Sequence, residues 1–401
     1  MSLSKLRFSK EHPFARIGDI LKRSKNIATV KDDQVYKRVT VKLYGGGVTI
    51  RDEVLGKEIR TKRQFLLKEG QFLFSRIDAR NGAFGIATAG VDNAIVTNDF
   101  PVFDVAKEKI IPEFFALITG SQYFFDYCQS FSSGTTNRQR LNEDSFLSFH
   151  IPLPPLSIQK QLVSSYQHCL QQAEEAKIKA NELEKGIETY LLAELGIEIQ
   201  KAEIQKKGLQ FVKFSEISRW DIWNVKQQFL NSNYPLIQLG NLIKMTSGQF
   251  LPKKTQIEGN YLVYGGNGVT GRHNQFIYEG KRLVIGRVGE KCGNVHLVEG
   301  QYWITDNAFK VDKISKEVTY EYLELAIRTL NLNQFKILSA QPSISQSIIL
   351  DLKIPLPPLS VQTTIVSHIN EQKAEIKRLR AEVEKLRTEA KEAFENEVFE
   401  Q

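Results

Sequence analysis

The sequence contains few of the residues that usually carry redox or metal chemistry. Among 401 residues there are three cysteines, two methionines, three tryptophans and six scattered histidines. Cys128, Cys169 and Cys292 form no Cys-x-x-Cys pair, so we expect reduced thiols and a cytoplasmic location rather than disulfides or a structural zinc site. Because no His-Glu-x-x-His motif is present either, we expect no bound metal.

Long apolar segments are also missing. No run of eighteen apolar residues occurs and the N-terminus has no apolar core, so we expect neither a membrane span nor a signal peptide. The composition is that of a globular protein, with 41% hydrophobic and 25% charged residues. Lysine and arginine exceed aspartate and glutamate by 54 to 46, and the net charge of +8 favours an anionic partner such as nucleic acid. A basic protein without such a partner fits the same charge.

The strongest feature that is present is an internal repeat. Residues 151–159 read Ile-Pro-Leu-Pro-Pro-Leu-Ser-Ile-Gln, and residues 354–362 differ only by a valine in the eighth position. Each copy precedes a proline-free stretch rich in alanine, glutamate, lysine and leucine, which predicts a helix of roughly forty residues. Ser157 and Ser360 are the expected N-caps, and Gly196 is the expected end of the first helix.

Apolar residues in both expected helices follow alternating steps of four and three, which predicts a coiled coil between them. One series is bulky in its middle and the other is rich in alanine, so the two backbones can approach closely. The alternative is two amphipathic helices that dock on different cores. The series are Leu162, Tyr166, Cys169, Ala173, Ala176, Ala180, Leu183 and Ile187 in the first helix, and Ile365, Ile369, Gln372, Ile376, Leu379, Val383, Leu386 and Ala390 in the second.

Each helix follows a strand-rich segment of roughly 150 residues, and the two segments resemble one another. Residues 71–82 parallel 282–293, and residues 95–99 parallel 303–307. We therefore predict an α+β fold with two similar strand-rich globular domains and two long antiparallel helices that form an intramolecular coiled coil, a tandem duplication with an approximate two-fold axis. The expected bounds are 1–150 and 208–353 for the globular domains, and 151–207 and 354–401 for the proline motifs with their helices.

A domain–helix–domain–helix chain with this proline motif before each helix resembles the specificity subunit of type I restriction–modification systems. Ser75–Gly85, Gly134–Leu141 and Tyr264–Gly271 are also similar to the target recognition domains of that family, although Ser339–Ser345 in the second lobe departs from Gly134–Leu141. The resemblance covers nearly the whole chain. It implies that each globular domain reads one half of a bipartite DNA target with a nonspecific spacer, and that the helices separate the lobes and hold the modification subunits.

The sequence has no P-loop and no Asn-Pro-Pro-Tyr-type motif, which suits a subunit that recognises DNA without catalysing a reaction. The resemblance implies double-stranded DNA and two modification (methyltransferase) subunits as partners, with restriction and translocase subunits in complexes that also cleave, and no membrane. S-adenosylmethionine, Mg2+ and ATP are expected in the partner subunits, and no cofactor in this chain. The alternative is a coiled-coil scaffold whose two lobes bind ligands other than DNA, such as peptides or carbohydrates.

Base recognition needs side chains with paired hydrogen-bond groups at the end of a rigid turn. Arginine suits guanine, asparagine suits adenine, and lysine or serine positions phosphate. The DNA-binding candidates in the first lobe are Lys42, Tyr44, Arg76, Arg80, Asn81, Arg138 and Arg140, and those in the second are Tyr264, Asn267, Thr270, Arg272, Arg287, Lys291 and Asn294. For each of them, an ordinary surface or structural role is the alternative.

A glycine pattern in the second lobe imitates a dinucleotide-binding motif. Gly266–Gly271 matches Gly-x-Gly-x-x-Gly, but that motif must be followed by a helix whose N-terminus holds a pyrophosphate. Here the sequence continues as Arg-His-Asn-Gln-Phe-Ile-Tyr, which predicts a turn and a strand. We expect a hairpin that presents side chains to DNA, or one that is purely structural. Trp220, Trp223 and Trp303 are expected to pack in the core or against the helices.

Overall fold

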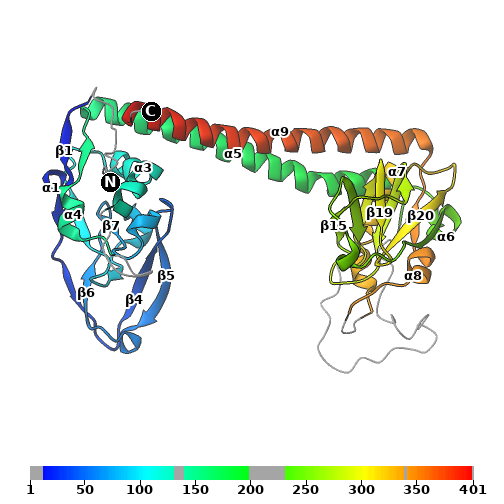
Figure 1. Cartoon of the computed structure of the whole chain (residues 1–401), viewed down its shortest axis with the longest axis horizontal. Helices are drawn as coiled ribbons and strands as arrows, with labels where there is room; N and C mark the ends of the chain where they lie inside the picture. Colours follow the sequence, from blue (N-terminus) through cyan, green and yellow to red (C-terminus); the bar gives the residue numbers. More distant parts are fainter. Residues whose placement is uncertain (1–11, 131–139, 198–230, 338–340, 400–401) are drawn as a thin grey trace. The chain divides into compact units, whose positions relative to one another are not determined.

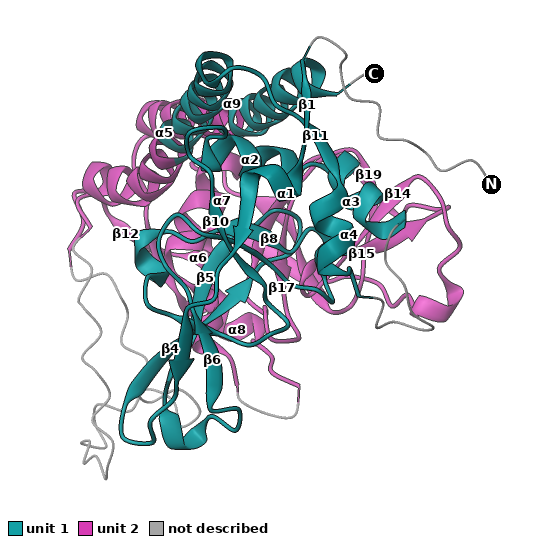
Figure 2. Ribbon diagram, turned by 90° about the vertical axis from the view of Figure 1, so that its left-hand side faces the viewer, with its two compact units in different colours: residues 1–177, 380–401 teal, residues 178–379 magenta. Residues whose placement is uncertain are grey.

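The chain forms two compact units, which Figure 2 shows in different colours. Unit 1 comprises residues 1–177 and 380–401, and unit 2 comprises residues 178–379. Each unit therefore contains one strand-rich lobe together with one half of each long helix. The computed structural model describes residues 12–130, 140–197, 231–337 and 341–399.

Unit 1 combines three sheets with short helices. Its strand orders are β1-β11, β2-β10-β7-β8 and β3-β6-β9-β4-β5. Figure 1 shows strands β4 and β5 reaching toward the end of the lobe that lies away from α5. The elements are β1 (Phe14–Arg16), α1 (Ile17–Ile20), β2 (Leu21–Arg23), β3 (Ile27–Thr29), β4 (Val35–Val41), β5 (Val48–Leu55), η1 (Gly56–Glu58), β6 (Arg63–Leu66), β7 (Phe72–Phe74), η2 (Ala79–Asn81), β8 (Phe84–Ile86), η3 (Ala89–Val91), β9 (Ile95–Val96), β10 (Val102–Val105), α2 (Pro112–Thr119), α3 (Gln122–Ser130), α4 (Glu143–Ser148), β11 (His150–Pro152) and the first half of α5 (Leu156–Leu195).

Unit 2 also has three sheets. Their strand orders are β12-β21, β13-β20-β17-β18 and β15-β14-β19-β16. The elements are β12 (Leu236–Gln238), α6 (Leu239–Leu242), β13 (Ile243–Ser247), η5 (Lys253–Thr255), β14 (Tyr261–Gly265), β15 (Gly268–His273), β16 (Tyr278–Glu279), β17 (Arg282–Gly286), β18 (Val295–Val298), β19 (Gln301–Ile304), β20 (Ala308–Ile314), α7 (Tyr320–Thr329), η6 (Leu332–Phe335), α8 (Gln346–Asp351), β21 (Lys353–Pro355) and the first half of α9 (Leu359–Val398).

The two lobes share one framework, which confirms the predicted duplication. The two-stranded sheets β1-β11 and β12-β21 correspond, and β2-β10-β7-β8 corresponds strand by strand to β13-β20-β17-β18. The helices correspond as well: α1 and α6 follow the first strand of their lobe, α2 and α7 follow β10 and β20, and α4 and α8 precede β11 and β21. The remaining sheets differ, because unit 1 has five strands in this place and unit 2 has four. The lobes have therefore diverged mainly in the third sheet.

The long helices α5 and α9 pack against each other within each unit, as predicted. In unit 2 the ring of Tyr190 lies 4.1 Å from the ring of His368, and Lys179 Nζ lies 4.0 Å from Glu375 Oε1. Residue numbers thus rise along α5 while they fall along α9, so the helices are antiparallel. Each residue of the two predicted series is buried or half-buried, and Gly196 follows α5 with a φ of +60°. The coiled coil and the helix end are both confirmed.

The expected serine N-caps are wrong by two positions. Helix α5 begins at Leu156 and α9 at Leu359, directly after the last proline of each motif, so Ser157 and Ser360 lie in the first helical turn. The carbonyl of Pro155 accepts hydrogen bonds from Ile158 N at 2.9 Å and Gln159 N at 3.1 Å. Proline has a fixed φ, and the carbonyl of Pro155 already satisfies the N–H of Ile158 in the first turn, so the helix begins without a capping serine.

The glutamine that ends each proline motif is fully buried and makes three hydrogen bonds to the backbone. In unit 1 the amide oxygen of Gln159 accepts from Ile111 N at 2.8 Å, and its nitrogen donates to the carbonyls of Lys109 at 3.1 Å and Pro154 at 2.8 Å. This side chain ties the start of α2 to the start of α5. In unit 2 the matching bonds of Gln362 go to Thr319 N, Glu317 O and Pro357 O.

The two lobes have different kinds of core. Phenylalanines dominate the core of unit 1, where the rings of Phe72 on β7 and Phe146 on α4 are stacked with their centroids 5.8 Å apart. The core of unit 2 is mainly aliphatic around Leu283 and Ile285. It also contains Tyr322, whose hydroxyl donates to Pro355 O at 2.7 Å, and burial raises the pKa of this phenol. Trp303 is buried as expected, whereas Trp220 and Trp223 lie outside the described residues.

Candidate nucleic-acid interface

The first-lobe candidates Arg76, Arg80 and Asn81 lie on the turn that joins β7 to β8. The backbone N–H of Arg76 donates to Asp99 O at 3.0 Å, and the carbonyl of Arg76 accepts from Leu141 N at 2.9 Å. The start of this turn is therefore clamped between the loop before β10 and the segment before α4.

The turn between β17 and β18 in the second lobe is held in the same way. Arg287 N donates to Asn307 O at 2.9 Å, and Arg287 O accepts from Ile344 N at 2.9 Å. These bonds repeat those of Arg76 on corresponding strands. The structure thus places Arg76 and Arg287 at equivalent positions, as the sequence repeat predicts.

Both turns end at a glycine with a left-handed backbone. Gly82 has a φ of +75° and Gly293 a φ of +92°. A Cβ on Gly82 would lie 2.3 Å from the ring of Phe125, and one on Gly293 would lie 2.7 Å from the backbone of Leu332. Since only glycine fits the conformation and the space, each turn is fixed in shape by its surroundings.

A hairpin turn lies against the β7–β8 turn in unit 1. It joins β4 to β5, and its Tyr44 N–H donates to Asn81 O at 2.8 Å while Gly45 N–H donates to Gly82 O at 2.9 Å. The structure therefore brings Tyr44 and its neighbour Lys42 together with Arg80 and Asn81, although nearly forty residues separate the two pairs in the sequence.

Unit 2 repeats this arrangement with the β14–β15 hairpin. A Cβ on Gly286 would lie 2.1 Å from Gly266 O, and one on Gly289 would lie 3.5 Å from Asn267 Oδ1. The hairpin turn thus contacts the Arg287 turn closely enough to require glycine. Gly266–Gly271 forms the hairpin turn and strand β15, with no helix after it, so the predicted hairpin is confirmed.

The side chain of Arg76 is engaged within its own lobe. Its Nη2 donates to Glu143 Oε2 at 2.7 Å, and Arg23 Nε lies 3.1 Å from the other oxygen of the same carboxylate. Burial lowers the pKa of Arg23, Glu143 opposes this shift, and the neighbouring Arg76 charge adds to it. In this arrangement Glu143 neutralises two half-buried guanidinium groups and stabilises the turn.

Arg287 has a different environment at the equivalent position. Its side chain is exposed, its guanidinium carbon lies 5.6 Å from the ring centroid of Phe309, and its Nη1 is 3.4 Å from Ser247 Oγ. Among the residues that the structure describes, no carboxylate pairs with Arg287 in the way Glu143 pairs with Arg76. Of its neighbours on the turn, Lys291 is exposed and Asn294 is half-buried.

The other first-lobe candidates differ in exposure. Lys42 and Tyr44 are exposed, whereas Arg80 and Asn81 are half-buried. Arg140 is also exposed, and its Nη2 lies 3.4 Å from Asp99 Oδ1, next to the backbone clamp of Arg76. Arg138 lies outside the described residues.

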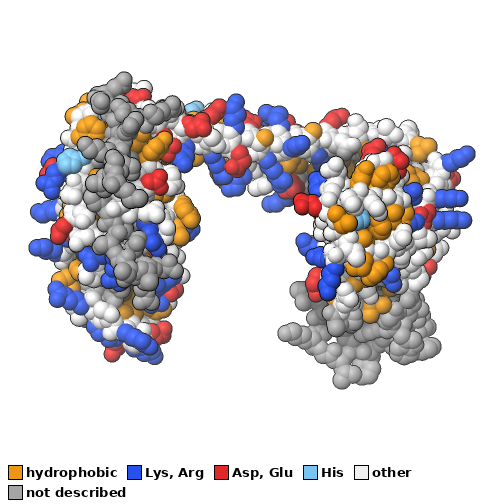
Figure 3. Space-filling view, viewed as in Figure 1, with side chains coloured by type: hydrophobic (Ala, Val, Ile, Leu, Met, Phe, Trp, Pro, Cys, Tyr) orange, Lys and Arg blue, Asp and Glu red, His pale blue; other side chains and the backbone are white. Residues whose placement is uncertain are grey.

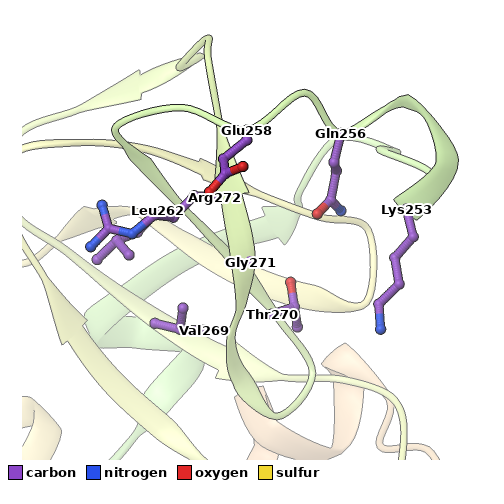
Figure 4. A pocket seen from close by; sticks show the side chains of 8 residues that line it. All are labelled: Lys253, Gln256, Glu258, Leu262, Val269, Thr270, Gly271 and Arg272. Atoms are coloured by element: carbon purple, nitrogen blue, oxygen red, sulfur yellow. The ribbon is translucent and has the colours of Figure 1, made fainter.

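Three second-lobe candidates lie along β14 and β15 rather than at the turn. Tyr264 is half-buried with its ring edge-on to Tyr302, and burial raises the pKa of its phenol. Thr270 donates to Val263 O at 3.2 Å, and Arg272 donates to Asn260 O at 3.1 Å. Figure 4 shows Thr270 and Arg272 beside an open pocket, which is also lined by Lys253, Gln256, Glu258, Leu262, Val269 and Gly271.

Two charged residues that now belong to the candidate sites are absent from the sequence prediction. Glu143 is 67 positions from Arg76 in the chain, so no local motif joins them. Lys253 belongs to the η5 turn, and only its neighbour Lys254 in the sequence hints at a basic segment. Figure 3 shows lysine and arginine side chains interspersed with acidic ones on the visible face of each lobe, and hydrophobic side chains gathered over β15 and β19.

Comparison with known proteins gives the family. The family model of the type I restriction modification DNA specificity domain matches residues 10–185 and 231–385, once for each lobe. The chain therefore belongs to this family. It is 30% identical to the EcoprrI specificity subunit of Escherichia coli, over 33% of this chain and 34% of that protein. It is 23% identical to the MjaVIII specificity subunit of Methanocaldococcus jannaschii, over 94% of this chain and 87% of that protein.

Solved structures share the fold. The HsdS subunit of Thermoanaerobacter tengcongensis has a TM-score of 0.55 at 17% identity, with 99% of this chain and 100% of that chain covered. A chain from a structure that describes complex assembly and conformational transition of a type I R-M system has a TM-score of 0.62 at 16% identity, with 97% of both chains covered. In the part of our structure that is described, no helix is long and apolar enough to span a bilayer.

Proposed function

We propose that this chain is the DNA-recognition subunit of a type I restriction–modification complex, without catalytic activity of its own. The observation that supports this most is the pair of contacting turns that each lobe assembles, one at the end of a strand and one in a hairpin. Each pair offers arginine or lysine together with asparagine on a backbone that its surroundings fix. Such side chains on rigid turns suit the edges of guanine and adenine and the neighbouring phosphates.

In this proposal each lobe reads one half of a bipartite target, and the bases between the halves go unread. Arg80, Asn81 and Lys42 contact the first half, and Arg287, Lys291 and Asn267 contact the second. Arg76 acts differently from Arg287, because its ion pair with Glu143 holds the turn in place. Divergence of the third sheet changes the hairpin beside each turn and so suits two different half-sites.

The partners in this proposal are double-stranded DNA and two modification subunits, with restriction and translocase subunits in a complex that also cleaves. S-adenosylmethionine, Mg2+ and ATP then act in those subunits, and the complex works in the cytoplasm where the DNA lies. Among the residues that the structure describes, no group of three or more histidine, cysteine or acidic side chains could hold a metal ion.

The test compares point variants in the two lobes by methylome sequencing. The chain is co-expressed with the modification subunits of its own system, and Arg80→Ala is compared with Arg287→Ala. Loss of one bidentate contact costs about 1–3 kcal/mol of discrimination. We expect Arg80→Ala to relax only one half of the methylated motif and Arg287→Ala only the other. Arg51→Ala and Lys313→Ala, exposed cations outside the turns, are the matched controls and should leave both halves unchanged.

The same complexes also distinguish this proposal from the alternative of a scaffold that binds ligands other than DNA. Binding of the complex to duplex DNA should weaken steeply as the salt concentration rises, because phosphate neutralisation releases counterions. A methylated motif that both arginine variants leave intact would show that these turns do not read DNA. Absence of salt-dependent DNA binding by the complex would favour a scaffold with other ligands.

A further inference from the structure

The hairpin turn of the first lobe has an unusual residue at its tip. Leu43 O accepts from Gly46 N at 3.1 Å, and the two central residues have positive φ, +56° at Tyr44 and +69° at Gly45. This is the pattern of a type I′ turn, which strongly favours asparagine, aspartate or glycine at both central positions. A tyrosine is unfavourable there because its Cβ crowds the following carbonyl oxygen.

Tyr44 stands apart from the other residues with this backbone conformation. Among the described residues, two more non-glycine residues have positive φ, and both Asn93 and Asn331 are of the type that tolerates it. The tyrosine gains no burial in return, since it is 74% exposed. A strained residue that contributes nothing to the core points to a use outside the core.

The turn that carries Tyr44 is held firmly. Its backbone N–H groups donate to Asn81 O and Gly82 O, and Gly45 lies so close to Gly120 at the end of α2 that a Cβ would be 3.1 Å from it. The backbone that carries the ring is therefore held at a fixed place, so a partner that contacts the ring does not have to order the turn.

We propose that Tyr44 stacks on a base of the first half-site, so that the first lobe reads its half partly through the stacking and deformation of DNA. This inference rests on the proposed function. The charges around the turn favour DNA as the occupant, because Lys42 is exposed two residues away and the Arg80 turn is bonded to it. A side chain that inserts between base steps unstacks and kinks a duplex; an aromatic ring stacks on any base face exposed in this way, and nearby cations hold the phosphates.

The corresponding β14–β15 hairpin turn of the second lobe has no aromatic residue at its tip. At the corresponding hairpin turn the residues from 265 to 268 are Gly-Gly-Asn-Gly, which offer an amide but no ring. The proposal therefore makes the two lobes unequal: the first distorts its half-site, and the second reads its own by hydrogen bonds to base edges.

The experiment uses the complete complex with its modification subunits and duplexes that carry 2-aminopurine at single positions of either half-site. Tyr44→Gly removes the ring and suits the positive φ, whereas Tyr44→Phe keeps the ring. Stacking on one base corresponds to roughly 5- to 150-fold in affinity. We expect Tyr44→Gly to lose about that much, to lose the fluorescence change at one first-half position, and to keep or raise the melting temperature. Tyr44→Phe should behave like wild type.

Val35→Ala is the control, because Val35 is 61% exposed at the other end of the same hairpin, and it should change neither affinity nor fluorescence. Wild-type affinity and fluorescence in Tyr44→Gly would overturn the proposal, and so would weaker assembly with the modification subunits at unchanged DNA contact. The outcome also distinguishes failure of the stacking role from failure of the proposed function. If wild type reads a bipartite motif and Tyr44→Gly reads it equally well, only the stacking role fails; if wild type reads none, the proposed function fails.

Discussion

Replacing Gln159 by leucine should destabilise unit 1 without touching its surface. The change removes all three hydrogen bonds of this fully buried side chain and leaves Ile111 N, Lys109 O and Pro154 O without their partner. Each buried group left unsatisfied costs about 1–3 kcal/mol. Water can reach some of these partly buried groups, and leucine regains apolar contact, so we expect a net loss of about 3 kcal/mol. For a unit of this size that is a fall of roughly 6–12 °C in melting temperature.

The assay is urea unfolding together with hydrogen exchange measured by mass spectrometry. Exchange should accelerate at the start of α2 and around the proline motif, where the three bonds end. Gln172→Leu is the control, because Gln172 is exposed on the same helix in the same unit, and its loss should stay within about 0.5 kcal/mol. Gln362→Leu should produce the same effect at the start of α7 in unit 2. A loss below 1 kcal/mol with unchanged exchange at α2 would refute the reasoning.

Two further predictions concern the turns and the thiols. Gly82→Ala should lower the free energy of unfolding by about 2–4 kcal/mol, because a φ of +75° combines with a Cβ 2.3 Å from the Phe125 ring. Gly47→Ala is the control and should cost only about 1 kcal/mol, because Gly47 has a similar φ but a Cβ there meets no atom within 4 Å. Equal losses of the two variants in urea unfolding would contradict the role given to the Phe125 contact. Burial raises the pKa of the Cys128 thiol well above its usual range. A thiol reagent at pH 8 should therefore modify the half-buried Cys169 first and Cys128 only when the protein unfolds. Peptide mapping of the modified protein would show the order.

The arrangement of the helices and of the equivalent turns could be predicted wherever the sequence itself is repeated. The proline motif and the four-three spacing led to α5 and α9, and the similarity of residues 71–82 to 282–293 led to equivalent turns with the same backbone bonds. Repetition and periodicity are regular along the chain, so they can be recognised without coordinates. For this reason the two long helices and the duplication of the lobes could be predicted, and the structure confirms both.

Contacts between unrelated segments could not be predicted in this way. No local sequence pattern links Arg76 to Glu143 or Gln159 to Ile111, because the partners are 67 and 48 positions apart in the chain and meet only in the folded structure. The serine N-caps failed for a local reason, since the prolines themselves start the helix. The ring of Tyr44 could be proposed as a DNA contact from its neighbours, but its strained backbone depends on hydrogen bonds to the β7–β8 turn.

The division of both long helices between the units has a consequence for the order in which the protein matures on the ribosome. The core of unit 1 includes Phe394, Val398 and Phe399 from the last stretch of α9, and the ring of Phe394 lies 5.8 Å from that of Phe114. At roughly 5–20 residues per second, synthesis of the intervening chain takes on the order of tens of seconds. Unit 2 can therefore complete its core first, although translation of unit 1 begins earlier. Until the end of α9 has been synthesised, the nascent first lobe exposes the apolar surface that Phe394, Val398 and Phe399 later cover.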